Sequence, residues 1–249
     1  MKSDEILDRY GLYIIGVIAL LVLFNWYELS SFTAAPAGSA FHSSSSFIPT
    51  FGKSSSSDKM IATSSGGIAL KVVNTGDAVQ DAITALIPTG TPAYGNELSV
   101  SYDDPAKSLA ALANLDYQIP TKTLTAEEKQ RFVDVGTKIS CEFCCSAPAV
   151  IDQNGRDLCG CAHAASFRGL AKYLIKAHPN DYSDDQILLE LTRWKSLYYP
   201  RNMVEKASAL INNRMELTAA NLNDRQLLSK LSSGDTSSIG QLPSMVGGC

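Results

Sequence analysis

The sequence lacks the motifs of several well-known enzyme classes. It contains no His-Glu-x-x-His motif, no phosphate-binding loop and no recognisable set of nucleophile, base and orienting residue. It also lacks an excess of positive charge, because the net charge of the 249-residue chain is -4. Without a basic surface, nucleic acid is set aside as a partner. These absences favour a binding protein over an enzyme.

Charge is also missing from residues 11–24, which form one continuous apolar run. Together with Tyr10 and the Asn25-Trp26-Tyr27 segment, this run is long enough to cross a hydrocarbon core of about 30 Å as a helix. The aromatic residues suit the two membrane interfaces. We therefore predict one transmembrane anchor at residues 10–27, in contact with the lipid bilayer. A cleaved signal peptide is the alternative, but the small-residue cleavage contexts lie too far downstream of the apolar run.

No Lys or Arg occurs between Arg9 and Lys53, whereas Lys2 and Arg9 precede the anchor. The positive-inside rule then places residues 1–9 in the cytoplasm as a short tail. No lipobox cysteine follows the anchor, and no myristoylation motif starts the chain. The predicted location is the cell membrane, with a single pass and an extracytoplasmic C-terminal domain.

Residues 28–66 show no apolar periodicity and include the serine runs 43–46 and 54–57. We expect a flexible linker there. The 45% of apolar residues in the chain allows a core, which we place in a soluble domain of residues 67–232. Residues 233–249 then form a flexible tail that ends in a cysteine. The predicted fold class of the domain is mainly α with a small β-hairpin (α+β).

Capping residues and apolar spacing predict the helices of this domain. The expected helices are 77–87, 104–115, 125–136, 162–177, one opened by Ser183, one opened by Pro200, and 224–231. Short strands are expected at 68–73 and 98–102. On the helix 162–177, Arg168, Lys172 and Lys176 repeat every four residues, which is typical of a solvated face, although they could also meet an acidic partner or lipid head groups.

Five of the six cysteines are concentrated in residues 141–163. The Asn154-Gly155 pair predicts a hairpin with a two-residue turn, in which Val150 faces Cys159. Such a turn brings the two cysteine groups together, as a thiolate metal site requires. The candidate ligands are Cys141, Cys144, Cys159 and Cys161, with Cys145 and His163 as substitutes or as ligands of a second ion.

The spacing of the cysteines bears on the identity of the metal. The first pair has the C-x-x-C spacing of a zinc ribbon, but the second pair is C-x-C. Zinc is favoured, with copper(I) or a [2Fe-2S] centre as alternatives. His163 is either a ligand or a core histidine on the inward face of its helix. Cys249 could be an extra ligand with Met245 as a soft copper(I) partner, could pair with another chain, or could be incidental.

Two hypotheses compete with a metal-binding protein that holds, buffers or transfers a thiophilic ion. An even number of cysteines outside the cytoplasm also suits a disulfide-stapled interaction module, although the adjacent Cys144 and Cys145 count against it. A thiol-disulfide oxidoreductase could use Cys141 and Cys144. Pro148 and the hairpin follow this motif, however, where a thioredoxin fold would have a helix.

The C-x-x-C-C, C-G-C-A-H and terminal G-G-C pattern, with the helix around Arg168-Gly169-Leu170, resembles a family of uncharacterised membrane-anchored prokaryotic Cys-rich proteins. The resemblance covers roughly residues 90–249. It implies a shared architecture and carries no assigned activity. The Cys-Gly-Cys element is also similar to that of the PCYCGC-motif lipoproteins, but the leading Pro-Cys-Tyr and the lipobox are missing here.

Overall fold

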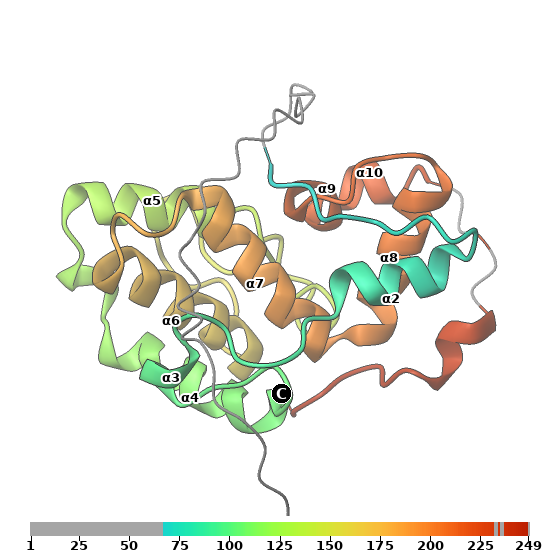
Figure 1. Ribbon diagram of the computed structural model, residues 1–249. Coiled ribbons are helices and arrows are strands. Elements are labelled where there is room, and N and C mark those ends of the chain that lie inside the picture. The colour runs from blue at the N-terminus through green and yellow to red at the C-terminus, as the bar shows by residue number, and fades with distance from the viewer. Residues whose placement is uncertain (1–66, 232–233, 235–236, 249) are drawn as a thin grey trace, which may run out of the picture. The chain divides into compact units, whose positions relative to one another are not determined.

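The fold of the domain is mainly helical and contains almost no strand. The structure, a computed structural model, describes residues 67–231, 234 and 237–248. In chain order the helices are α2 (Ala78–Leu86), α3 (Gly95–Leu98), α4 (Pro105–Gln118), η1 (Thr121–Thr123), α5 (Ala126–Gly136), α6 (Ala162–Ala177), α7 (Asp184–Tyr198), α8 (Pro200–Asn212), α9 (Ala219–Asn223), α10 (Arg225–Leu228) and η2 (Ser237–Gln241) (Figure 1).

Capping side chains fix the starts of the longer helices. Thr125 and Ser183 each form the expected capping box, with Glu128 and Gln186 respectively. The Asp77 carboxylate accepts hydrogen bonds from the first turn of α2. Each cap satisfies backbone N–H groups that have no partner within the helix. The predicted helices are therefore confirmed, and α6 spans the expected residues 162–177.

The two short strands predicted near the start of the domain are wrong. In the first segment only an isolated bridge forms, between Ala69 and Thr218. In the second, α3 occupies Gly95–Leu98, and Ser99 adopts a left-handed conformation with φ 54°. The Val100 N–H then donates back to the Gly95 carbonyl. Alternating apolar residues predict a strand only where a partner strand is available, and these backbone groups bond to helices and turns instead.

The hairpin forms with a register one residue away from the predicted one. Ile151 pairs with Asp157 in an isolated antiparallel bridge, and the Leu158 N–H donates to the Val150 carbonyl at 3.1 Å. The loop therefore has three residues, and Gly155 takes the left-handed conformation with φ 77°. The cause is Asp152, whose Oδ1 accepts from the N–H groups of both Asn154 and Arg156. A side-chain acceptor at this position favours a turn followed by a bulge.

Helices α6 and α7 lie at the centre of the fold (Figure 1). Helix α6 packs along α4 and against α5, and α7 contacts α5, α6, α8 and α9. At the crossing of α4 and α6, a Cβ atom on Gly169 would clash with the Leu112 carbonyl. Glycine thus permits the close approach of the two backbones. The predicted apolar face of α7 is buried, including Trp194 and Tyr198.

The solvated face predicted for α6 is wrong at two of its three residues. Arg168 and Lys172 are only 3% and 2% exposed. Both form ion pairs with Asp116 of α4, at 2.6 Å each. The close crossing of α4 and α6 covers the two basic side chains, so they need this buried carboxylate as a partner. Lys176 lies beyond the crossing and is exposed, as expected.

The predicted membrane anchor (10–27) and linker (28–66) lie outside the described residues, as does Cys249. Within the part of the chain that the structure describes, no helix is both long and apolar enough to cross a bilayer. In the segment 233–249, the described residues form η2 and make backbone hydrogen bonds to α8 and to the end of α7, through Pro243 and Val246.

Candidate metal centre

Two turns of backbone bring the cysteines to one end of α6. After Cys141 the chain turns sharply, and the N–H groups of Cys144 and Cys145 both point to the Cys141 carbonyl, at 3.2 and 3.4 Å. Cys161 is the N-cap residue of α6, where its Sγ accepts from the Ala164 N–H at 3.4 Å. The helix N-terminus carries a partial positive charge, which stabilises a thiolate at this position.

The five cysteines that the structure describes are not equivalent. Cys145 and Cys159 form a disulfide, and Cys144 is not a free thiol. Cys141 and Cys161 are free, and their sulfur atoms lie 3.4 Å apart. The four-thiolate set expected from the spacing is therefore not the group that the described residues assemble. Two of its members, Cys141 and Cys161, do come together.

His163 completes this group from the first turn of α6. One ligand atom each from Cys141, Cys161 and His163 lie within 4.8 Å of one another. The imidazole is fully buried, with Tyr198 and Tyr199 ring centroids each 5.0 Å from its own. His163 is therefore a core histidine, as one of the two interpretations expected, and it also lies beside the two thiols.

The hydrogen bonds of His163 determine which nitrogen can bind a metal. Nε2 lies 2.8 Å from the Val246 carbonyl. A carbonyl only accepts, so Nε2 carries the proton and the lone pair is on Nδ1. Nδ1 is buried and has no hydrogen-bond partner among the described residues. A carbonyl that holds one imidazole nitrogen while the other remains available is the usual outer-sphere arrangement of a metal-binding histidine.

The two free thiols have opposite proton affinities. The hydrogen bond with Cys161, together with burial, holds the pKa of Cys141 far above its usual value. The same hydrogen bond, helped by the neighbouring His163 side chain and by the Ala164 N–H, holds the pKa of Cys161 well below its usual value. The negative charge of the hydrogen-bonded pair is therefore favoured on Cys161. Tyr199 adds a hydrogen bond of 2.8 Å between its hydroxyl and Cys141 Sγ.

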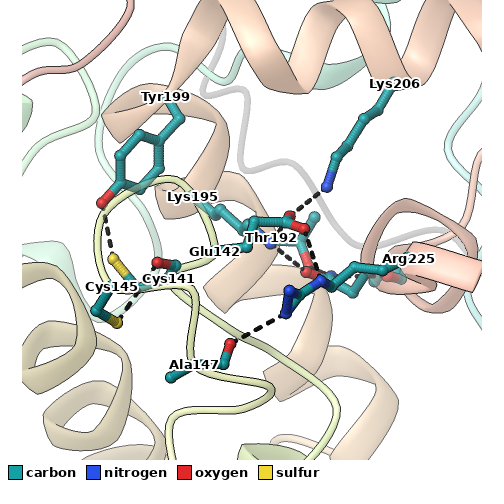
Figure 2. Close-up of polar contacts among 11 residues, drawn as sticks. Cys141, Glu142, Cys145, Ala147, Thr192, Lys195, Tyr199, Lys206 and Arg225 are labelled. Carbon is teal, nitrogen blue, oxygen red and sulfur yellow. Dashed lines mark hydrogen bonds and ion pairs between the residues drawn. The ribbon is translucent and has the colours of Figure 1, made fainter. Parts of the chain in front are cut away.

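Basic side chains surround the residue after Cys141. Figure 2 shows the Glu142 carboxylate facing Lys195, Lys206 and Arg225, which come from α7, α8 and α10. Lys195 Nζ lies 2.8 Å from Glu142 Oε1. Burial lowers the pKa of Lys195 to about 8, although Glu142 opposes the shift. Burial would raise the pKa of Glu142, but Lys195 and Lys206 outweigh it and keep that pKa below its usual value.

These contacts hold the cysteine-bearing loop on the helices. Arg225 also donates to the Ala147 carbonyl at 3.1 Å (Figure 2). On the other cysteine segment, Arg168 donates to the Cys159 carbonyl at 2.7 Å. Both turns that carry the sulfur atoms are thus fixed by buried or half-buried cations. The sequence gives only a weak signal for them, namely a basic residue inside an apolar helical face such as Lys195 beside Trp194.

The described part of the C-terminal segment covers the histidine through the Val246 carbonyl. Arg201 binds the carbonyls of Leu242 and Pro243, through its side chain and its backbone N–H respectively. This places Val246 beside His163. Met245, considered above as a copper(I) partner, is 37% exposed.

Comparisons of the chain with protein-family models, with curated proteins and with solved structures give no match.

Proposed function

We propose that the protein binds a thiophilic metal ion through Cys141 Sγ, Cys161 Sγ and His163 Nδ1. The observation that carries this proposal is the buried Nδ1 of His163, which has no hydrogen-bond partner among the described residues, in a side chain that lies beside two free thiols. A buried nitrogen without a partner costs about 1–3 kcal/mol, and a metal ion bound to the lone pair removes that cost. Two sulfur ligands and one imidazole suit zinc and copper(I).

The size of the site fits an ion after a small adjustment. Two sulfur ligands at about 2.3 Å from a tetrahedral ion lie roughly 3.8 Å apart. The present distance of 3.4 Å corresponds to a pair that shares a proton. Binding would replace that proton and separate the sulfur atoms by a few tenths of an ångström.

The number of ligands supports a role in holding or transferring the ion. Three protein ligands leave the fourth position of tetrahedral zinc open, and copper(I) accepts low-coordinate thiolates. An open position is where a ligand from a partner can enter and take the ion. A [2Fe-2S] centre is less well supported, because it needs four ligands and the described residues bring two thiols and one imidazole together.

Titration of the purified metal-free protein with zinc and with copper(I) tests the proposal. We expect one equivalent of metal per chain, protection of two thiols from alkylation, and release of protons on binding. His163→Ala should weaken binding by roughly a hundredfold, because a ligand is lost. His178→Ala is the matched control, since His178 binds Glu97 and Asp181 at the surface and its loss should change nothing. Equal binding by wild type and His163→Ala would refute the proposal.

We also propose that the domain is tethered to the outer side of the cell membrane by residues 10–27. The Cys145–Cys159 disulfide supports this location, because disulfides persist in oxidising compartments. Protease added to intact cells should degrade the C-terminal domain and spare an epitope tag fused to the N-terminus. A domain that stays intact until the cells are lysed would contradict this orientation.

A further inference from the structure

Four sulfur atoms of the site form a row. Cys141 Sγ lies 3.4 Å from Cys161 Sγ, and Cys161 Sγ lies 3.5 Å from Cys159 Sγ. Cys159 is bonded to Cys145. A free thiol therefore contacts one sulfur of a disulfide on one side and a second free thiol on the other. This is the arrangement that consecutive thiol–disulfide exchange requires, since each step is an attack of one sulfur on its neighbour.

We propose that the protein carries out thiol–disulfide exchange along this row, which moves the disulfide from Cys145–Cys159 to Cys141–Cys161. In the first step Cys161 sulfur attacks Cys159, the Cys159–Cys161 bond forms, and Cys145 leaves with the bonding electron pair. In the second step Cys141 sulfur attacks Cys161, and Cys159 leaves. Each attacking thiol gives up one proton and each leaving thiolate takes one. One disulfide and two thiols are present before and after, so no external oxidant is needed.

The residues around the sulfur row hold Cys159 and Cys161 in place and leave Cys145 free to move. Arg168 holds the Cys159 carbonyl at 2.7 Å, and the N-cap position fixes Cys161. Cys145 is exposed, so its sulfur can move away after the bond breaks. Its Sγ also lies 3.7 Å from the Cys141 carbonyl (Figure 2). That oxygen can accept an S–H hydrogen bond once Cys145 has become a thiol.

The exchange has a consequence that rests on the proposed function. A Cys141–Cys161 disulfide consumes both sulfur ligands of the metal site. A bound ion would therefore block the exchange by occupying the two thiolates, and the exchanged form would not hold the ion. The protein would release its metal when the disulfide moves inward.

The exchange is tested on the full-length protein in the presence of a chelator and without reductant. The native protein is incubated with iodoacetamide at pH 8, quenched in acid at intervals, and its modified cysteines and disulfides are mapped by mass spectrometry. We expect Cys145 to become alkylated in wild type, because the first step exposes its thiol. In Cys161→Ser, alkylation of Cys145 should be at least tenfold slower. Wild-type protein whose Cys145 stays unmodified would overturn the proposal.

Two variants separate the steps and the two proposals. Cys141→Ser retains the first step, so Cys145 is still alkylated, but the Cys141–Cys161 linkage found in quenched wild type is absent. His163→Ala retains the whole sulfur row, so it should exchange like wild type while it loses metal affinity. Wild-type protein that exchanges its disulfide but binds no metal would disprove only the proposed function, whereas wild-type protein that binds metal without alkylation of Cys145 would disprove only the exchange. Circular dichroism confirms that each variant is folded.

Discussion

Glu142 lies among three basic side chains, and its replacement by glutamine tests whether this charge cluster holds the cysteine loop in place. The Glu142 side chain is 8% exposed, and that of Lys195 is fully buried. In Glu142→Gln, Lys195 keeps its hydrogen bond to Asn223 but loses its counter-charge. Removal of one partner from a buried ion pair costs about 3–5 kcal/mol. Because Lys206 and Arg225 are partly exposed, we expect a value near the lower end, about 3 kcal/mol.

The reverse substitution should be much milder. In Lys195→Met the carboxylate of Glu142 still faces Lys206 and Arg225, and a costly buried ammonium group is gone. We therefore expect a loss of about 1 kcal/mol or less from the free energy of unfolding. The two variants should therefore lose different amounts of unfolding free energy. If Glu142 and Lys195 depended on each other equally, the two losses would be similar.

Urea unfolding measures both losses in a Trp26→Phe background, where the buried Trp194 is the only tryptophan in the sequence. At a slope of about 2 kcal/mol per molar urea, a loss of about 3 kcal/mol moves the midpoint by roughly 1.5 M. Lys195→Met should move it by roughly 0.5 M or less. Equal shifts for the two variants, or a stable Glu142→Gln, would refute the reasoning.

Three further predictions use the same unfolding measurement. Burial lowers the pKa of Lys195 to about 8, whereas its pKa in the unfolded chain is near 10.5. Between these two values the unfolded state binds one more proton than the folded state, so wild type should gain stability as the pH rises. Lys195→Met should lack this gain. Gly169→Ala should cost about 2–3 kcal/mol through its clash with the Leu112 carbonyl; an unchanged midpoint would show that α4 and α6 separate easily. Tyr199→Phe should cost about 1 kcal/mol by removing the 2.8 Å hydrogen bond to Cys141, and no loss would show that the bond contributes nothing.

Local signals predicted the helices well and the long-range partners poorly. Capping boxes and proline positions depend on residues three or four apart, so Thr125 and Ser183 mark the starts of α5 and α7 from the sequence alone. The burial of Arg168 and Lys172 depends on Asp116, a residue more than fifty positions away. Spacing within one helix could not reveal that partner, and two cations on one face are more often solvated.

In the candidate site, too, local spacing was informative and the long-range contacts were not predicted. Spacing alone identified Cys141, Cys161 and His163 as candidates, because all three lie in the cysteine-rich segment. Spacing could not separate these three from the other candidate ligands, because that choice depends on which sulfur atoms are already paired and on contacts with distant segments. Val246 fixes the tautomer of His163, and Tyr199 binds Cys141. Neither residue carries a motif that would assign it to a metal site.

The register of the hairpin shows how a local side chain changed the predicted position of Cys159. With the predicted two-residue turn, Cys159 would face Val150 inside the ladder. Asp152 accepts from two backbone N–H groups of the loop and adds one residue to the turn. Leu158 then bonds to Val150, and Cys159 lies beyond the paired residues. A one-residue shift reverses the face on which each side chain lies, so the turn that Asp152 stabilises changes the position of Cys159 relative to the predicted register.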